Sequence, residues 1–196
     1  MTGPSGLEPR SINGQPFGAW VVKANPALSD VDAMVAATRT DITGWCVQQN
    51  YRSALMKPQD LVFLWISGGS KTVVSGFWGV GVIEDPPLLE GEADEHTGLA
   101  ADAAARARLT AHLTLAVTER PVSRAECKAD PILAEIEVLR VAQIGNPSFL
   151  TPEGRDRLLA LMQTGPPAEG HVGHATGRAD DGGRCLGSEM VWTTAR

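Results

Sequence analysis

The chain has 196 residues, of which 43% are hydrophobic and 20% are charged. This length can bury a sizeable core in one domain without disulfide bonds or metal ions, and two full domains would be a tight fit. Its 17 basic and 23 acidic residues give a formal net charge of −6. That balance excludes a protein that coats nucleic acid through bulk positive charge, but it leaves open a local pocket that reads one base.

The first part of the chain predicts an arm, a strand and a helix. Residues 1–17 are rich in glycine and proline, which predicts a flexible N-terminal arm. Residues 19–23 are apolar and contain valines, which indicates a short strand. Ser29 is a good N-cap for a helix with one apolar face that runs to about residue 38.

The next stretch predicts a pair of strands. Residues 43–45 predict an irregular segment, and Asn50 is placed to cap a short helix. Residues 60–67 form a nearly continuous apolar run, which is typical of a strand buried on both faces. Residues 68–71 predict a hairpin turn, after which residues 72–83 return as the partner strand.

Three glycines in that partner strand bear on the shape of the sheet. Gly76, Gly79 and Gly81 predict bulges or strong curvature, as in a small barrel. Strands that follow one another through hairpins and loops argue against a doubly wound parallel sheet. The pattern therefore predicts an α+β fold, with about five or six strands in a curved sheet and a few short flanking helices.

The second half of the chain begins with an acidic insertion and ends with a tail. Residues 84–108 run from prolines through acidic residues to alanines, which predicts a loop. Residues 109–117 indicate a strand, and residues 131–141 a short helix that runs into a strand. Pro152 suits the first position of another helix, and residues 164–196 predict a flexible tail rich in glycine, proline and histidine.

The cysteines and the apolar runs bear on the compartment. Cys46, Cys127 and Cys185 are far apart in the sequence and form no C-x-x-C pair, so we expect free thiols in a reducing environment. The longest strongly apolar run, residues 61–66, is about a third of the length that a membrane span needs. No signal-peptide pattern is present. We therefore expect a cytoplasmic protein with no membrane partner.

Sequence signatures of catalysis, cofactors and metal ions are missing from the chain. No G-x-S-x-G, H-E-x-x-H or dinucleotide-binding glycine pattern occurs. His171, His174 and Cys185 have a spacing that fits no zinc motif. We therefore expect no metal site and no cofactor, and the residues favour a binding protein over an enzyme.

Trp45 and the polar residues after it form the most informative group in the sequence. The polar residues are Gln48, Gln49, Asn50, Tyr51 and Arg52. An indole face can stack on a flat base and amides can pair with its hydrogen-bonding edge, which is the composition of a base pocket. Trp45 could equally plug one end of a barrel, and the local composition leaves both interpretations open.

Several motifs together resemble a known family. They are a W-x-V-K-like strand at residues 20–23, a W-x4-N-Y element from Trp45 to Tyr51, the MKPQDLVF strand of residues 56–63, and a glycine-containing strand at 76–83 followed by Asp85-Pro86. These motifs resemble the EVE domain, which belongs to the PUA-like superfamily alongside the YTH and ASCH domains. Residues 146–153 are similar to the closing strand and helix of that family. The resemblance covers residues 18–163, where we expect one EVE-like domain.

The resemblance implies a small β-barrel with flanking short helices and a pocket that takes a single nucleobase. It implies a non-catalytic module whose partner is DNA or RNA carrying a modified base such as 5-methylcytosine. The chain departs from the family pattern before Asn50, where Gln49 stands in place of a basic residue, and before Asp60, where Gln59 replaces a glycine. These departures leave the identity of the ligand open.

Two groups of site residues are expected. The base pocket would use Trp45, Gln49, Asn50, Tyr51, Ser67 and Trp78, and flanking phosphates would be held by Lys23, Arg52, Lys57 and Lys71. Structural alternatives stay open for several of them. Asn50 can cap the short helix, Tyr51 can belong to the core, and Ser67 can serve the turn. Trp78 can pack on the outside of the barrel.

Two other functions also stay open. In the first, the pocket belongs to an enzyme that acts on a modified nucleobase or nucleotide, with Asp41 as the carboxylate close to Trp45 in the sequence. In the second, the pocket is degenerate and the chain binds a protein partner or a small molecule.

Overall fold

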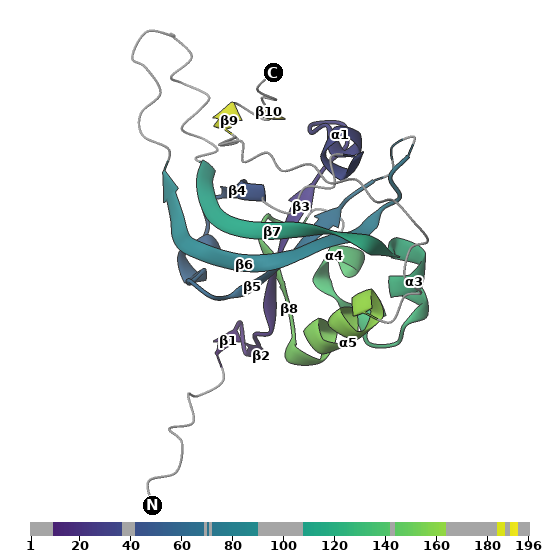
Figure 1. The fold of residues 1–196 in the computed structure, drawn as a ribbon. Coiled ribbons are helices and arrows are strands. Elements are labelled where there is room, and N and C mark those ends of the chain that lie inside the picture. Colours follow the sequence, from purple (N-terminus) through teal and green to yellow (C-terminus); the bar gives the residue numbers. More distant parts are fainter. Residues whose placement is uncertain are drawn as a thin grey trace, which may run out of the picture.

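A strongly curved sheet forms the body of the computed structural model (Figure 1). The structure describes residues 10–36, 42–68, 70, 72–89, 108–141, 144–163, 184–186 and 189–191. Six strands run in the order β4-β7-β6-β5-β3-β8. Their bounds are β3 (Ala19–Ala24), β4 (Ile42–Gln48), β5 (Leu61–Ile66), β6 (Gly76–Leu89), β7 (Arg108–Ser123) and β8 (Ser148–Leu150). Within this sheet β3 and β5 pair in parallel and the other neighbours are antiparallel. The predicted α+β class with five or six strands is confirmed.

Short helices cover one side of the sheet. The elements α3 (Arg124–Ala129), η3 (Leu133–Glu135), α4 (Glu137–Arg140) and α5 (Pro152–Gln163) lie together, and α1 (Val31–Ala36) lies apart from them (Figure 1). Alternate residues of β3 face opposite ways, as the period of a strand requires. Trp20 and Val22 join a core enclosed by the curved sheet, whereas Ala19 and Val21 join a second core under the helices.

The glycines of β6 let the sheet bend sharply. An added Cβ at Gly81 would lie 1.9 Å from the carbonyl oxygen of Thr114, and one at Gly79 would lie 2.8 Å from that of Ala116. The pairing of β6 with β7 shifts register between Phe77 and Gly79, as at a β-bulge. The predicted bulges and curvature are confirmed.

Replacing Gly81 with alanine is expected to destabilise the protein. A methyl group 1.9 Å from a carbonyl oxygen fits only if β6 and β7 move apart, and overpacking of this kind typically costs about 1–3 kcal/mol. Urea denaturation measures the loss. The matched control is Gly154→Ala in α5, where the nearest atoms lie at 3.6 Å or more and the change should be neutral or stabilising. Equal stability of the Gly81 variant and the wild type would contradict the close approach of these strands.

Three local predictions differ from the structure. Helix α1 is capped by Asp30 and not by Ser29, because Asp30 Oδ1 accepts the Ala33 N–H at 3.0 Å. Residues 43–45 are part of β4, because pairing with β7 outweighs their weak local preference. Residues 131–141 form η3 and α4 and no strand.

Residues 10–17 belong to the fold, which corrects the prediction of a flexible arm for this part of the chain. Strands β1 (Ser11–Ile12) and β2 (Gln15–Pro16) pair antiparallel. Asn13 and Gly14 form the turn with φ angles of 51° and 76°, the left-handed conformation that Asn-Gly turns favour. The Asn-Gly dipeptide was therefore a hairpin signal within a proline-rich segment.

The carboxylate of Asp60 fixes this hairpin to the sheet. Its Oδ2 atom accepts hydrogen bonds from the Arg10 guanidinium at 2.7 Å, from Trp20 Nε1 at 2.8 Å and from the Lys57 backbone N–H at 2.9 Å. The Arg10 guanidinium also lies 3.7 Å from the ring centroid of Phe17. The N-terminal segment is thus held against the start of β5.

The tail and the cysteines also depart from expectation. Strands β9 (Arg184–Leu186) and β10 (Glu189–Val191) pair antiparallel within the predicted tail, and β9 lies against β4. Most of the predicted insertion and tail, residues 90–107 and 164–183, lies outside the described residues.

Cys46 is disulfide-bonded, so the expectation of free thiols is wrong at this residue and no longer supports a reducing compartment. Cys127 is a buried free thiol, and burial raises its pKa to about 12. Among the described residues, no helix is long and apolar enough to cross a membrane.

Candidate nucleic-acid interface

The turn after β4 is fixed by its own side chains. Asn50 Oδ1 accepts the backbone N–H groups of Arg52 at 2.8 Å and Ser53 at 3.1 Å. Ser53 Oγ accepts the Asn50 N–H at 3.1 Å and donates to the Asn50 carbonyl at 2.8 Å. Asn50 therefore organises the turn that leads into the short helix η1 (Ser53–Leu55), although the N-cap position of that helix is Arg52 and not Asn50.

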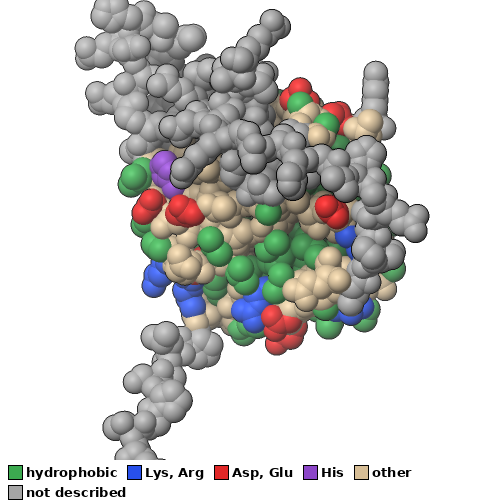
Figure 2. Space-filling model, viewed as in Figure 1, with side chains coloured by type: hydrophobic (Ala, Val, Ile, Leu, Met, Phe, Trp, Pro, Cys, Tyr) green, Lys and Arg blue, Asp and Glu red, His purple; other side chains and the backbone are tan. Residues whose placement is uncertain are grey.

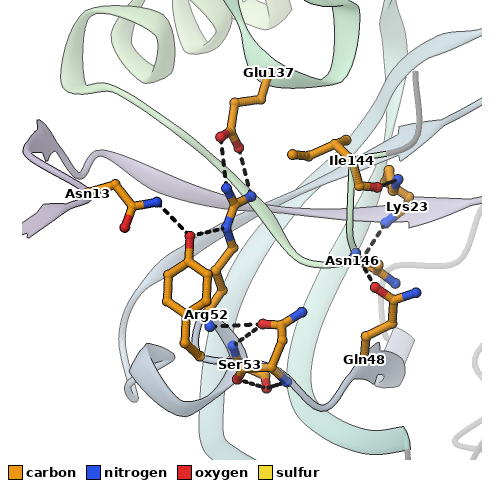
Figure 3. Close-up of polar contacts among 10 residues, drawn as sticks. Asn13, Lys23, Gln48, Arg52, Ser53, Glu137, Ile144 and Asn146 are labelled. Carbon is orange, nitrogen blue, oxygen red and sulfur yellow. Dashed lines mark hydrogen bonds and ion pairs between the residues drawn. The ribbon is translucent and has the colours of Figure 1, made fainter. Parts of the chain in front are cut away.

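Asn146 forms hydrogen bonds to both β3 and β4, two strands that are not neighbours in the sheet order but that the curvature of the sheet brings close together. Its Oδ1 accepts the Lys23 N–H at 3.2 Å, and its Nδ2 donates to the Cys46 carbonyl at 2.8 Å. Its carbonyl accepts the Gln48 N–H at 2.7 Å, and its N–H donates to Gln48 Oε1 at 3.2 Å. We call this region, composed of Lys23, Gln48, Asn50, Gly145 and Asn146, the β3–β4 seam. Figure 3 labels Lys23, Gln48 and Asn146 within it.

The amide groups of the seam are oriented by the backbone. The side-chain oxygens of Gln48 and Asn50 both accept from backbone N–H groups, so their NH₂ groups point away from those donors. Neither NH₂ group has a hydrogen-bond partner among the described residues. An added Cβ at Gly145 would lie 3.1 Å from Gln48 Oε1 and 3.7 Å from Asn50 Nδ2. The loop at Gly145 thus lies close to both amides.

Lys23 adds a cationic donor to the seam. Its Nζ donates to the carbonyl of Ile144, and burial lowers the pKa of Lys23. An ammonium group has three N–H donors and no acceptor. Together with the two amides, it makes the seam a place that suits a ligand rich in oxygen acceptors.

Tyr51 and Arg52 connect the turn to the N-terminal hairpin and to α4 (Figure 3). The Tyr51 hydroxyl accepts from Asn13 Nδ2 at 2.7 Å and from Arg52 Nε at 2.9 Å. Arg52 also donates to both carboxylate oxygens of Glu137, at 2.8 and 2.9 Å. Burial disfavours the Arg52 charge, but the bonds to Tyr51 and Glu137 outweigh it, so the pKa of Arg52 is raised. Arg52 is thus engaged within the fold.

Trp45 and Trp78 lie in the core enclosed by the sheet. Their exposed fractions are 3% and 8%, and both belong to the same buried cluster as Trp20. Trp78 Nε1 donates to the Val74 carbonyl at 2.7 Å. A base could stack on either ring only after neighbouring side chains move apart, so a base pocket lined by these rings stays a prediction.

The remaining predicted residues lie around this region or beyond the described chain. Gln49 and Lys57 are exposed. Ser67 Oγ donates to the Ala24 carbonyl at 2.9 Å, in agreement with its turn alternative. Lys71 and Asp41 lie outside the described residues.

Four residues in or next to this region were not predicted from the sequence as site residues: Asn13, Glu137, Gly145 and Asn146. The Asn-Gly turn could have indicated the first, and the Gly-Asn-Pro run before a strand could have indicated the last two. Glu137 carries no local signal, because it meets Arg52 across 85 positions of sequence.

Comparisons with known proteins identify structures with the same fold. A protein from Pseudomonas putida superposes with a TM-score of 0.55 at 17% identity, covering 74% of this chain and 99% of that one. A hypothetical protein from Leishmania major gives 0.54 at 13% identity, covering 74% and 94%. The DUF55 domain of human thymocyte nuclear protein 1 gives 0.50 at 18% identity, covering 76% and 100%. These structures share the fold, and no curated protein sequence matches the chain. The family model of the EVE domain matches residues 18–149, so the chain belongs to the EVE domain family.

Proposed function

We propose that this EVE-domain chain binds nucleic acid at the β3–β4 seam and holds a modified base there, such as 5-methylcytosine, without catalysis. The observation that carries the proposal is the pair of amide NH₂ donors at Gln48 and Asn50, whose oxygens are engaged by backbone N–H groups, beside the half-buried ammonium group of Lys23, which donates to the Ile144 carbonyl. Phosphate oxygens and base carbonyls are acceptors, so nucleic acid offers the complementary groups.

Local chemistry supports this proposal better than overall charge does. On the face drawn in Figure 2, acidic and basic side chains of the described residues lie in small separate groups. The formal net charge is −6. A ligand drawn by a broad positive field is not expected here. Binding through a few directed hydrogen bonds favours recognition of one nucleotide over coating of a long strand.

The core behind β4 supplies the apolar part of the proposal. Trp45 faces this core three residues before Gln48. A methyl group on a base that enters there would gain about 0.8 kcal/mol per buried carbon, and the indole would stack on the base. Because the Trp45 ring is 3% exposed, such binding requires a rearrangement around it, which tryptophan fluorescence would report.

The test uses fluorescence anisotropy at low salt with short labelled DNA and RNA strands. Each strand is compared with and without methylated or hydroxymethylated cytosine, or methylated adenine. The variants Gln48→Glu and Asn50→Asp keep the acceptor oxygens that organise the seam and replace the outward NH₂ donors by carboxylate oxygens. We expect each variant to lose about tenfold or more in affinity, since hydrogen bonds to charged groups are worth about 1.5–3 kcal/mol.

The matched control is Gln163→Glu, the same change of charge at an exposed position at the end of α5. It should bind as the wild type does. Wild-type affinity in both seam variants would contradict the proposed site, and equal affinity for modified and unmodified strands would contradict the proposed preference.

A further inference from the structure

Tyr51 presents an aromatic ring that is both exposed and fixed. The residue is 51% exposed, yet its hydroxyl accepts two hydrogen bonds, from Asn13 and from Arg52. Arg52 is itself held by both oxygens of Glu137. An exposed side chain normally loses rotamer freedom when it binds a partner. The Tyr51 ring has already lost that freedom, so it can offer its exposed surface at little further entropic cost.

The hydrogen bonds of the Tyr51 hydroxyl explain how the ring is oriented. They do not explain why so much of the ring is exposed to solvent. The polar tip of Tyr51 satisfies Asn13 and Arg52, and the Arg52 guanidinium lies 5.6 Å from the ring centroid. A core role would bury the ring, which the 51% exposure excludes. Leu55, one turn further along η1, is also 36% exposed. Both apolar side chains are thus open to solvent close to the turn that carries Asn50.

The position of Tyr51 relative to the seam suggests what its ring contacts. Tyr51 directly follows Asn50, whose amide donor faces the seam, and the Asn50–Ser53 hydrogen bonds hold both residues in one rigid turn. Because Asn50 and Tyr51 are consecutive residues of this turn, a nucleotide held at Asn50 would have its neighbour within reach of the Tyr51 ring.

We propose that Tyr51 stacks on the unpaired base adjacent to the one bound at the seam, so that the ligand is single-stranded nucleic acid. The inference rests on the proposed function. A base inside a duplex already stacks on neighbours at both of its faces, and a tyrosine can take one of those faces only if the base is unstacked. Aromatic stacking is tolerant of sequence. Tyr51 thus selects single-stranded over double-stranded ligands, whereas the seam recognises the identity of the base.

The experiment compares three single-stranded ligands and one duplex on the full chain by isothermal titration calorimetry. The first three are the nucleoside monophosphate of the preferred modified base, a trinucleotide with that base at its centre, and the same trinucleotide with abasic flanks. A 15-base-pair duplex with the modified base at its centre is the fourth arm. We expect the trinucleotide to bind roughly 5- to 150-fold more tightly than its abasic counterpart, the range that stacking of one base supplies. The duplex should bind more weakly than the trinucleotide.

Three variants assign this gain to the ring. Tyr51→Ala and Tyr51→Leu should lose this gain, measured in each variant as the ratio of the affinities for the trinucleotide and for its abasic counterpart. Tyr51→Phe should keep part of the gain, because it retains the ring but not the hydroxyl that bonds to Asn13 and Arg52. Thermal unfolding of each variant confirms that it is folded. A gain that persists in Tyr51→Ala, a leucine variant that matches the wild type, or a duplex that binds as well as the trinucleotide would overturn the inference while the seam still binds the monophosphate. Absence of binding to every nucleotide ligand would instead overturn the proposed function.

Discussion

Replacing Arg52 with alanine is expected to lower the free energy of unfolding by about 1.5–3 kcal/mol, the usual worth of hydrogen bonds to charged groups, because the Arg52–Glu137 pair is only partly buried. The Arg52 and Glu137 side chains are 11% and 27% exposed and are joined by two hydrogen bonds. The substitution leaves the Glu137 carboxylate without its partner. It also removes a donor to the Tyr51 hydroxyl and a cation 5.5 Å from the Phe149 ring. Urea denaturation followed by circular dichroism measures the change.

A double-mutant cycle separates the ion pair from simple packing. Arg52→Met with Glu137→Met removes both charges and keeps apolar volume, so the double variant should be more stable than the sum of the single losses predicts. Full additivity would show that the two side chains are not coupled and would contradict the bidentate contact.

Substitution of Glu137 also tests the prediction that Arg52 binds a phosphate group of the ligand. In the structure its guanidinium is engaged with Glu137 and Tyr51. Glu137→Gln weakens the competing partner while keeping its shape. If Arg52 turns to a phosphate when nucleic acid binds, this variant should bind the strand more tightly than the wild type, which anisotropy would measure. Unchanged affinity would assign Arg52 to the stability of the turn alone.

The elements that could be predicted from the sequence are those whose signals are local. Strand β5 is a run of consecutive apolar residues, and helix α5 starts at Pro152. Strand β4 was missed because Thr43 and Gly44 suit turns, and only the partner strand β7 makes them extended. Such a preference is set by neighbours that are distant in sequence, so no local pattern could show it.

In the candidate site, too, residues with a local sequence signal could be predicted and those that meet across long stretches of sequence could not. Asn50 and Tyr51 were identified from a short motif, and the structure places both in one rigid turn. Their surroundings come from far away: Asn146 meets Gln48 across 98 positions and Glu137 meets Arg52 across 85. The motif therefore identified Asn50, but the predicted pocket used Gln49 in place of Gln48 and did not include the loop at Asn146 that orients Gln48.

Trp45 is the second position where a large effect is expected, and here stability and binding must be measured separately. Its ring is 3% exposed within the main core. Removing a buried tryptophan side chain typically costs about 3–5 kcal/mol, so Trp45→Ala should unfold at markedly lower urea concentration. A loss of nucleic-acid binding in that variant would then follow from unfolding as readily as from a missing contact.

Trp45→Phe resolves this ambiguity, because it keeps an aromatic ring in the core and should lose much less stability than the alanine variant. If a modified base stacks on Trp45, the smaller ring should reduce the preference for the modified strand while affinity for the unmodified strand changes little. Asn50→Asp should instead weaken both, because its donor serves either strand. Anisotropy titrations of the two variants with the matched strands distinguish these patterns. An unchanged preference in Trp45→Phe would assign Trp45 to the core alone and would leave recognition to the donors of the seam.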